Sequence, residues 1–175
     1  GLILTSWIFG VTAIAIKRED GGSVFYKQDR CTKDGRVFSI LKFRSMVEHV
    51  ENDNFHITEH EDNRITNVGH FIRRTKIDEL PQLINILRGD MSLVGPRPER
   101  PELIEEIVQY IPEYRFRTTV KAGLTGYAQV HGDYHTDFLE KLRWDMIYIE
   151  NYSILLDLKI ILMTIPTLLR GSSDV

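Results

Sequence analysis

The stretch from Ile65 to Glu102, ITNVGHFIRRTKIDELPQLINILRGDMSLVGPRPERPE, decides the fold of the centre of the chain. Apolar residues within it recur at the i, i+3, i+4, i+7 spacing of an amphipathic helix, at Leu80, Leu83, Ile84 and Leu87. Pro81 suits the first turn of this helix, and Gly89 suits its C-terminal end. If the helix instead extends upstream, Pro81 kinks it. In both cases Asp78 and Glu79 lie beside a backbone irregularity.

Basic side chains flank this acidic pair in the sequence, at Arg73, Arg74, Lys76, Arg97 and Arg100. Arginine binds phosphate in a bidentate manner, so arginines on a constrained frame suggest a phosphate-bearing ligand. Neighbouring carboxylates diverge by about 100° around a helix, so one can face a reacting phosphorus and the other Mg²⁺. An Asp that attacks phosphorus is a known form of covalent catalysis. The alternative is an acidic pair that only stabilises the start of a helix.

Three prolines restrict the backbone around Arg97, at positions 96, 98 and 101. A loop of this kind can present the Arg97 guanidinium with little conformational entropy left to lose. It is therefore suited to hold a phosphate-binding side chain.

Composition sets the class of protein. The chain has 175 residues, of which 42% are hydrophobic and 27% charged, and this excludes a disordered tail or a fibre. The single cysteine, Cys31, excludes a disulfide framework and a cysteine-based zinc cluster. A net charge of −3 gives no reason to expect nucleic acid as a partner. Because the first residue is Gly1 and not Met, we expect a piece of a longer chain.

The N-terminal run, residues 2–16, contains no charge and is followed at once by Lys17 and Arg18. As a helix it would span roughly 22 Å, less than the roughly 30 Å hydrocarbon core of a bilayer. It fits the end of a longer spanning helix, a re-entrant segment, or a buried soluble helix, and we expect membrane contact. The basic pair would place the following segment on the cytoplasmic side.

The segment Ser153 to Arg170 is also strongly apolar, with only Asp157 and Lys159 charged inside it. Two explanations stay open, an interfacial amphipathic helix and a C-terminal helix packed on the core. Upstream, residues 102–152 are mostly helical in pattern, and a short strand is expected at Tyr127–Val130.

A β-hairpin is predicted from Val24–Lys27 and Val37–Met46, with Asp34-Gly35 as its turn. Residues 27–44 carry a net charge of +4, which could attract phosphate or anionic lipid. Four of these basic residues are interpreted as solvated: Lys27, Arg30, Lys33 and Arg36.

The acidic stretch 48–63 contains His56, Glu59 and His60 in the H-x-x-E-H pattern of some zinc peptidases. A metal-dependent hydrolase is therefore one alternative function, although such a helix would lack an apolar face to anchor it. A non-catalytic membrane-binding or assembly module is the other alternative.

Five sequence words follow one another along the chain. They are Lys42-Phe43-Arg44-Ser45-Met46, Arg64-Ile65-Thr66, Asp78-Glu79-Leu80-Pro81-Gln82-Leu83, GDMSLVGPRPE at 89–99, and Gly123-Leu124-Thr125-Gly126. Through these words nearly the whole chain resembles the bacterial sugar transferase family, the monotopic phosphoglycosyl transferases. The words DELPQL and LVGPRPE make the resemblance highly specific.

The resemblance implies a membrane-bound enzyme that transfers a sugar 1-phosphate from a UDP-sugar to polyprenyl (undecaprenyl) phosphate. Asp78 would attack the β-phosphorus, forming a phosphosugar-aspartate and releasing the nucleoside monophosphate. Polyprenyl phosphate would then attack this intermediate in a ping-pong cycle. Glu79 would help to hold Mg²⁺, and Arg73 and Arg97 would bind substrate phosphate.

The family's core begins with a re-entrant membrane helix that is broken at Ser-Pro. The corresponding position here is Ser6-Trp7, so the usual proline is absent. Asp145 and Asp157 also lie in family-like words, and they receive no role from the resemblance.

The expected fold is α+β, predominantly helical with a small β-hairpin, and membrane-associated. Residues 1–19 would form the re-entrant helix. Residues 20–175 would form a catalytic domain on the cytoplasmic face of the bacterial inner membrane, with an interfacial helix at 153–170. The lipid bilayer is thus a partner beside donor and acceptor, and the apolar ends leave a homodimer open. The part from Tyr127 to Leu169 resembles long-form members that start exopolysaccharide or O-antigen units, which favours galactose or glucose, with an N-acetylated sugar as the alternative.

Overall fold

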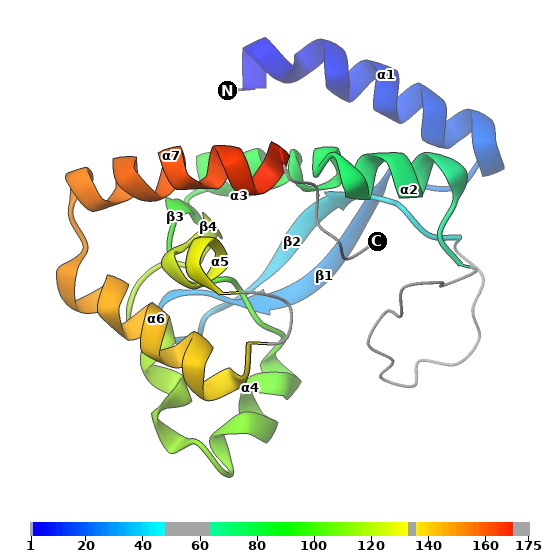
Figure 1. The fold of residues 1–175 in the computed structure, drawn as a ribbon. Helices are drawn as coiled ribbons and strands as arrows, with labels where there is room; N and C mark the ends of the chain where they lie inside the picture. Colours follow the sequence, from blue (N-terminus) through cyan, green and yellow to red (C-terminus); the bar gives the residue numbers. More distant parts are fainter. Residues whose placement is uncertain (1, 48–63, 133–135, 170–175) are drawn as a thin grey trace. The chain divides into compact units, whose positions relative to one another are not determined.

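The computed structural model describes residues 2–47, 64–132 and 136–169 as a mixed α/β protein that is mostly helical (Figure 1). Its elements are α1 (Leu2–Asp20), β1 (Phe25–Cys31), η1 (Lys33–Gly35), β2 (Val37–Phe43), α2 (Asn67–Arg74), η2 (Ile77–Glu79), α3 (Gln82–Arg88), β3 (Ser92–Val94), α4 (Pro101–Val108), η3 (Pro112–Thr119), β4 (Gly123–Thr125), α5 (Tyr127–His131), α6 (Phe138–Asn151) and α7 (Ile154–Leu169). The predicted helical predominance and small hairpin are confirmed. The acidic stretch 48–63, with His56, Glu59 and His60, lies outside the described residues.

The described residues divide into two compact units. The first is built from Gly1–Lys27 and Leu41–Ile84, and the second from Gln28–Ile40 and Asn85–Arg170. The hairpin of β1 and β2 contributes its open end to the first unit and its turn to the second. The division expected from the sequence, a re-entrant helix at residues 1–19 and a catalytic domain at residues 20–175, stays a prediction.

The hairpin turn is confirmed at Asp34-Gly35. Both residues have a positive φ, +58° and +73°, and the Arg36 N–H donates to the Lys33 carbonyl at 3.2 Å. Positive φ at both central residues is the signature of a two-residue turn that matches the twist of paired strands. Because so few residues are used in the turn, β1 continues to Cys31, beyond the predicted end at residue 27.

Strand β2 changes its buried face midway. Phe38 and Ile40 are buried on one face, in a cluster of the second unit. Farther along the strand, Leu41 and Phe43 are buried on the opposite face. Since strand side chains alternate between faces, two consecutive buried residues mark the change. Lys42 therefore lies on the face opposite Phe43.

In the first unit α1 lies beside α2 (Figure 1), and both pack on the hairpin end. Ile16, Phe43 and Ile72 form the buried centre, one from each of α1, β2 and α2. The start of α2 is capped twice: Thr66 Oγ1 accepts from the Gly69 N–H at 2.9 Å, and the Glu19 carboxylate accepts from two further amides of the first turn. Such caps satisfy amides that have no partner inside the helix.

Helix α1 is continuous from Leu2 and contains both Ser6 and Trp7, so no break is seen at these positions. Neither residue is a proline, which is the usual cause of a sharp helix break. Among the described residues, no helix has both the length and the apolar character needed to cross a bilayer. Re-entry into a membrane stays a prediction.

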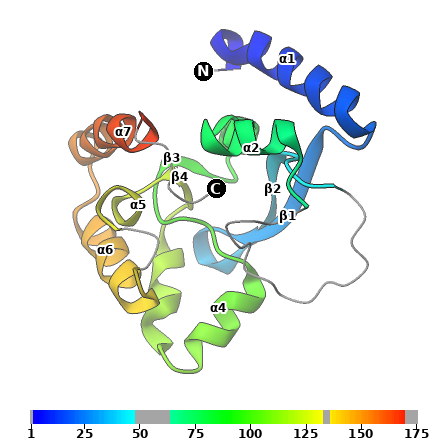
Figure 2. The same cartoon turned by 45° about the vertical axis from the view of Figure 1, so that its right-hand side comes forward.

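In the second unit β3 and β4 form a short parallel pair, with Ser92 opposite Gly123 and Val94 opposite Thr125. The backbones approach so closely at Gly123 that an added Cβ would lie 2.1 Å from the Gly95 nitrogen. The strand predicted at Tyr127–Val130 is wrong, because this segment is helix α5 (Figure 2). Strand β4 ends at Thr125, opposite Val94, the last residue of its parallel partner β3.

Helix α7, Ile154–Leu169, confirms a helix in the predicted segment 153–170. One side of it packs on the buried cluster of Val94, Tyr148 and Ile160. The Tyr148 hydroxyl donates a hydrogen bond at 2.9 Å to Asp157, in the first turn of α7. Asp157 thus has a structural role.

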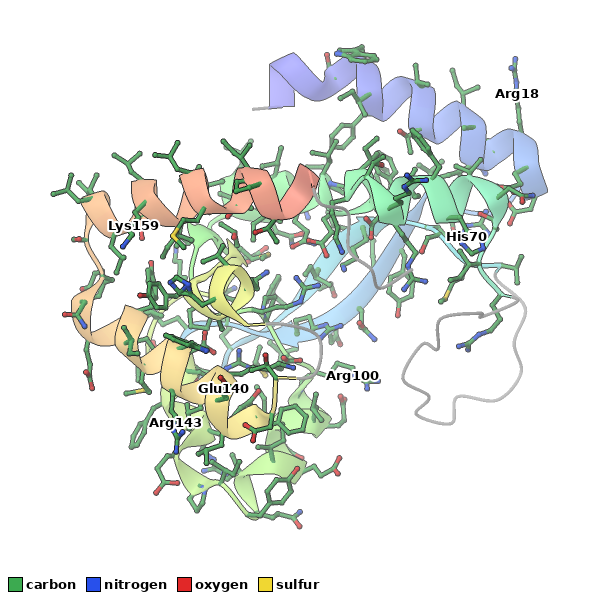
Figure 3. The ribbon with its side chains drawn as sticks, viewed as in Figure 1. Arg18, His70, Arg100, Glu140, Arg143 and Lys159 are labelled. Atoms are coloured by element: carbon green, nitrogen blue, oxygen red, sulfur yellow. The ribbon has the colours of Figure 1, made fainter. Side chains whose placement is uncertain are left out.

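We predict that Glu19→Ala lowers the free energy of unfolding by about 1–2 kcal/mol, because the first amides of α2 lose their acceptor. Thermal and denaturant unfolding followed by circular dichroism measures this. Arg18→Ala is the control, because Arg18 points away from α1 into open space in Figure 3 and its loss should change little. Equal stability of both variants would contradict the capping role.

Candidate functional site

The acidic pair lies on a single turn between two helices. Helix α2 ends at Arg74, Lys76 adopts the left-handed conformation with φ +55°, and the 3-10 turn Ile77–Glu79 follows. A non-glycine residue with positive φ is uncommon and marks a sharp change of chain direction. The predicted backbone irregularity beside Asp78 is therefore confirmed, together with the helix that follows it.

Apolar neighbours on both sides hold this turn in place. Ile77 and Leu80 are partly buried against the core of Ile16, Phe43 and Ile72. Because the residues that flank the acidic pair are anchored in the core, the pair has little freedom to move. Local sequence thus places two carboxylates on a rigid, packed element.

Asp78 is buried, with 9% of its surface exposed. Among the described residues, its Oδ1 has no hydrogen-bond partner. Burial raises the pKa of the Asp78 carboxyl above its ordinary value, and the positive charge of Lys42 opposes this only in part. A buried carboxylate oxygen without a donor is costly, and such groups concentrate at functional sites.

Lys42 joins the candidate site through an ion pair that the sequence did not indicate. Its Nζ donates to Glu79 Oε1 at 3.0 Å, and both side chains are largely buried. Lys42 and Glu79 lie 37 positions apart, and nothing in the sequence paired them. The pair fixes the Glu79 side chain and brings a positive charge close to Asp78.

Arg73, on the last turn of α2, belongs to the same unit. Its Nη1 is buried and has no hydrogen-bond partner among the described residues. A guanidinium in this state can still bind an anion. The structure therefore brings Arg73, Asp78, Glu79 and Lys42 together in the first unit.

Arg97 belongs to the second unit, in the loop that leaves β3. Its side chain is exposed, while Pro96 and Pro98 on either side are buried. The structure thus places the Arg97 side chain at the surface between two buried prolines, and its binding to phosphate stays a prediction. Ser6 and Trp7, the remaining predicted positions, lie in α1, where Trp7 is exposed.

The described residues contain no cluster of three or more His, Cys, Asp or Glu side chains suited to hold a metal ion. Asp78 and Glu79 alone offer two carboxylates, one of them with an unpartnered oxygen. Two carboxylates are a sufficient protein contribution for Mg²⁺ when substrate phosphate oxygens and water complete its shell. The donor set fits Mg²⁺ bound together with a phosphate ligand.

Comparison with known proteins extends over almost the whole chain. The family model described as bacterial sugar transferase matches residues 1–171. A UDP-N-acetylgalactosamine-undecaprenyl-phosphate N-acetylgalactosaminephosphotransferase of Aeromonas hydrophila is 43% identical over 91% of this chain and 38% of its own length. A UDP-glucose:undecaprenyl-phosphate glucose-1-phosphate transferase of Escherichia coli is 42% identical over 94% of this chain and 36% of its own length. A galactosyl transferase of Streptococcus agalactiae is 40% identical over 98% of this chain and 41% of its own length.

The chain therefore spans well under half the length of these relatives. Their names include glucose, galactose and N-acetylgalactosamine, and all three are similar to this chain to nearly the same degree.

We predict that Asp78→Asn stabilises the protein by about 1–3 kcal/mol at neutral pH, because it removes a buried charge with an unpartnered oxygen. The raised pKa of Asp78 means that the wild-type carboxyl becomes neutral as the pH falls, so the gain should shrink in acid. Thermal unfolding in metal-free buffer across this pH range measures it.

Glu79→Gln is the matched control. Its carboxylate is paired with Lys42, so the substitution should bring no gain in stability. An Asp78→Asn variant no more stable than wild type at neutral pH would contradict the buried-charge interpretation.

Proposed function

The chain belongs to the bacterial sugar transferase family, and we propose that it transfers a sugar 1-phosphate from a UDP-sugar to polyprenyl phosphate. The observation that carries the proposal is the buried Asp78, whose unpartnered oxygen lies on a rigid turn beside Glu79 and Lys42. A carboxylate in this setting suits the role of a nucleophile whose position is fixed before the substrate binds.

The reaction proceeds in two displacements. Asp78 Oδ1 attacks the β-phosphorus of the donor, and the bond from this phosphorus to the bridging oxygen breaks, which releases the nucleoside monophosphate. A phosphate oxygen of the polyprenyl phosphate then attacks the same phosphorus, the bond to Asp78 breaks, and the carboxylate is restored. Two easier steps replace one difficult step.

The neighbouring residues divide the remaining work. Arg73 and Arg97 bind substrate phosphate, since a guanidinium matches phosphate oxygens geometrically. Lys42 keeps the Glu79 carboxylate in place at 3.0 Å. Asp78 and Glu79 would hold Mg²⁺, which when bound neutralises charge on the diphosphate.

The acceptor is a lipid, so the site needs to lie near the surface of a bilayer. Two helices offer apolar faces for this. On α1 the exposed residues Trp7, Val11 and Ile14 follow the i, i+4, i+7 spacing of one stripe, opposite the packed Phe9 and Ile16. We propose that this stripe enters the headgroup region on the cytoplasmic face of the inner membrane.

Helix α7 has a second apolar stripe on the side turned away from the core. Its members are exposed by 50–80% and are Ile154, Leu155, Leu158, Leu162 and Ile165. At about 100° per residue they fall within one arc of about 100°. In Figure 3 Lys159 points to the other side of the helix. This arrangement supports an interfacial helix, which was one of the two alternatives open from sequence.

The sugar is proposed to be galactose or glucose, with N-acetylgalactosamine as the alternative that one relative's name supports. The metal-dependent hydrolase has no supporting observation among the described residues. A panel of UDP-sugars, assayed for nucleoside monophosphate release with polyprenyl phosphate present, identifies the donor.

We predict that incubation with the donor alone adds a hexose phosphate to the wild-type chain, detected by intact-mass analysis. Asp78→Asn should show no adduct and lose turnover by about 10³-fold or more, because it removes the nucleophile. Glu79→Gln should still form the adduct but require more Mg²⁺. Full turnover by Asp78→Asn would end the covalent mechanism.

We also predict that the double variant Leu155→Glu with Leu158→Glu weakens sedimentation with vesicles of anionic phospholipid, because two charges enter the apolar stripe. Leu139→Glu is the control, since Leu139 is an exposed leucine on α6, outside the stripe. If both proteins bind vesicles as wild type does, α7 is not interfacial.

A further inference from the structure

The loop that carries Arg97 is held by its backbone carbonyls. Four consecutive carbonyl oxygens, those of residues 96–99, each accept a hydrogen bond, and the donors come from three segments of the second unit. The donors are the Gly123 N–H to Pro96 at 2.9 Å, Arg117 Nη2 to Arg97 at 3.1 Å, Arg30 Nη1 to Pro98 at 3.2 Å and the Cys31 N–H to Glu99 at 2.9 Å. A loop usually leaves such groups to water, so this one is unusually fixed.

Arg117 is the donor to the backbone carbonyl of Arg97. Its side chain is only 4% exposed, and its guanidinium contacts Asp145 Oδ2 at 2.8 Å and 3.0 Å through two nitrogens. The same guanidinium donates to the Tyr114 hydroxyl at 2.8 Å and lies 3.5 Å from Glu99. Asp145, in α6, is 1% exposed. One buried cation thus joins η3, α6 and the loop.

The charge balance keeps Arg117 protonated. Burial is the largest single effect and would lower its pKa, but Asp145, Tyr114 and Glu99 together outweigh burial and leave the pKa raised. Because a guanidinium has five donors in a fixed fork, it can hold Asp145 and the Arg97 carbonyl at once. A lysine ammonium has one nitrogen and cannot reach both groups with the same geometry.

Glu99 contributes to the same arrangement from within the loop. Besides Arg117 it lies 3.6 Å from Arg30, the donor to the Pro98 carbonyl. Arg30 had been interpreted as solvated, but it is part-buried and bound to the loop. Two arginines therefore hold the backbone on both sides of the exposed Arg97 side chain.

We propose that Arg117, held by Asp145, is a positioning residue for Arg97: it fixes the backbone from which the Arg97 guanidinium reaches the diphosphate of the donor. The proposal rests on the proposed function, in which Arg97 binds substrate phosphate. Arg117 itself contacts no substrate, because its donors are taken by the protein. Its effect should therefore appear in donor binding more than in the chemical step.

The test uses Arg117→Lys, which keeps the charge and loses the fork, and Asp145→Asn, which keeps the size and loses the charge. For each we expect the donor KM and the Kd for UDP, measured by calorimetry, to rise by about 10-fold to 100-fold. The kcat should fall by less than about 3-fold, since the proposed role of Arg117 lies in donor binding and not in the chemical step. If Arg117→Lys does not fold, Asp145→Asn carries the same measurement.

A double-variant cycle separates positioning from general destabilisation. If Arg117 acts through Arg97, then adding Arg117→Lys to Arg97→Ala should weaken UDP binding no further. Ile160→Ala is the matched control, because it opens a cavity in the buried core of the same unit without touching the loop carbonyls. Its donor KM should stay within about 3-fold of wild type despite a lower melting temperature.

The outcomes distinguish the two proposals. Independent, multiplicative effects of Arg97→Ala and Arg117→Lys would overturn the positioning role, as would an Ile160→Ala variant with an equal rise in KM. An Arg97→Ala variant with unchanged donor binding would remove Arg97 from the proposed function itself. Weakened binding by Arg97→Ala together with wild-type binding by both Arg117→Lys and Asp145→Asn would overturn the positioning role alone.

Discussion

Burial of one carboxyl group is the constraint around which the first unit is arranged. An ionised Asp78 at 9% exposure loses hydration, which nearby positive charge offsets in part, while no donor among the described residues reaches its Oδ1. This arrangement leaves Oδ1 without a competing donor in the part of the chain that the structure describes. It also requires a backbone that does not move, which explains why α1, β2 and α2 all pack around the turn.

In the second unit the backbone is fixed and the side chain is exposed. Asp78 is a buried side chain on a short turn, whereas Arg97 is an exposed side chain on a loop whose backbone is buried and bound. In both cases the conformational entropy of the functional group is reduced before any ligand arrives. Prolines restrict the loop locally, and the buried Arg117 and the part-buried Arg30 fix it to the rest of the unit.

Both units also carry exposed apolar surface. Both α1 and α7 pack one side on their own unit and leave the other side apolar and exposed. Contiguous apolar surface of this kind is uncommon on a water-exposed face and marks an interaction site. With the lipid acceptor of the proposed function, a bilayer surface is the partner that we propose for these stripes.

Local chemistry alone determined the elements with strong local signals. The Asp34-Gly35 turn follows from residues that tolerate positive φ, and the helix after Pro81 follows from its apolar spacing. The acidic pair and the proline-framed Arg97 were visible for the same reason. The segment at Tyr127–Val130 was misassigned because its apolar pattern is too short to separate strand from helix; the strand that pairs with β3 ends before it, at Thr125, and the segment itself is helix α5.

Ion pairs between distant residues could only come from the tertiary structure. The partner of Lys42 lies on another element, and so do the partners of Arg117 and Arg30. A charged residue in a sequence is compatible with solvent or with any opposite charge that folding brings near. Periodicity and turn chemistry therefore determined where the functional residues stand along the chain, and the packing of distant elements decided which of them are held, buried and charged, because electrostatic partnership depends on distance in space.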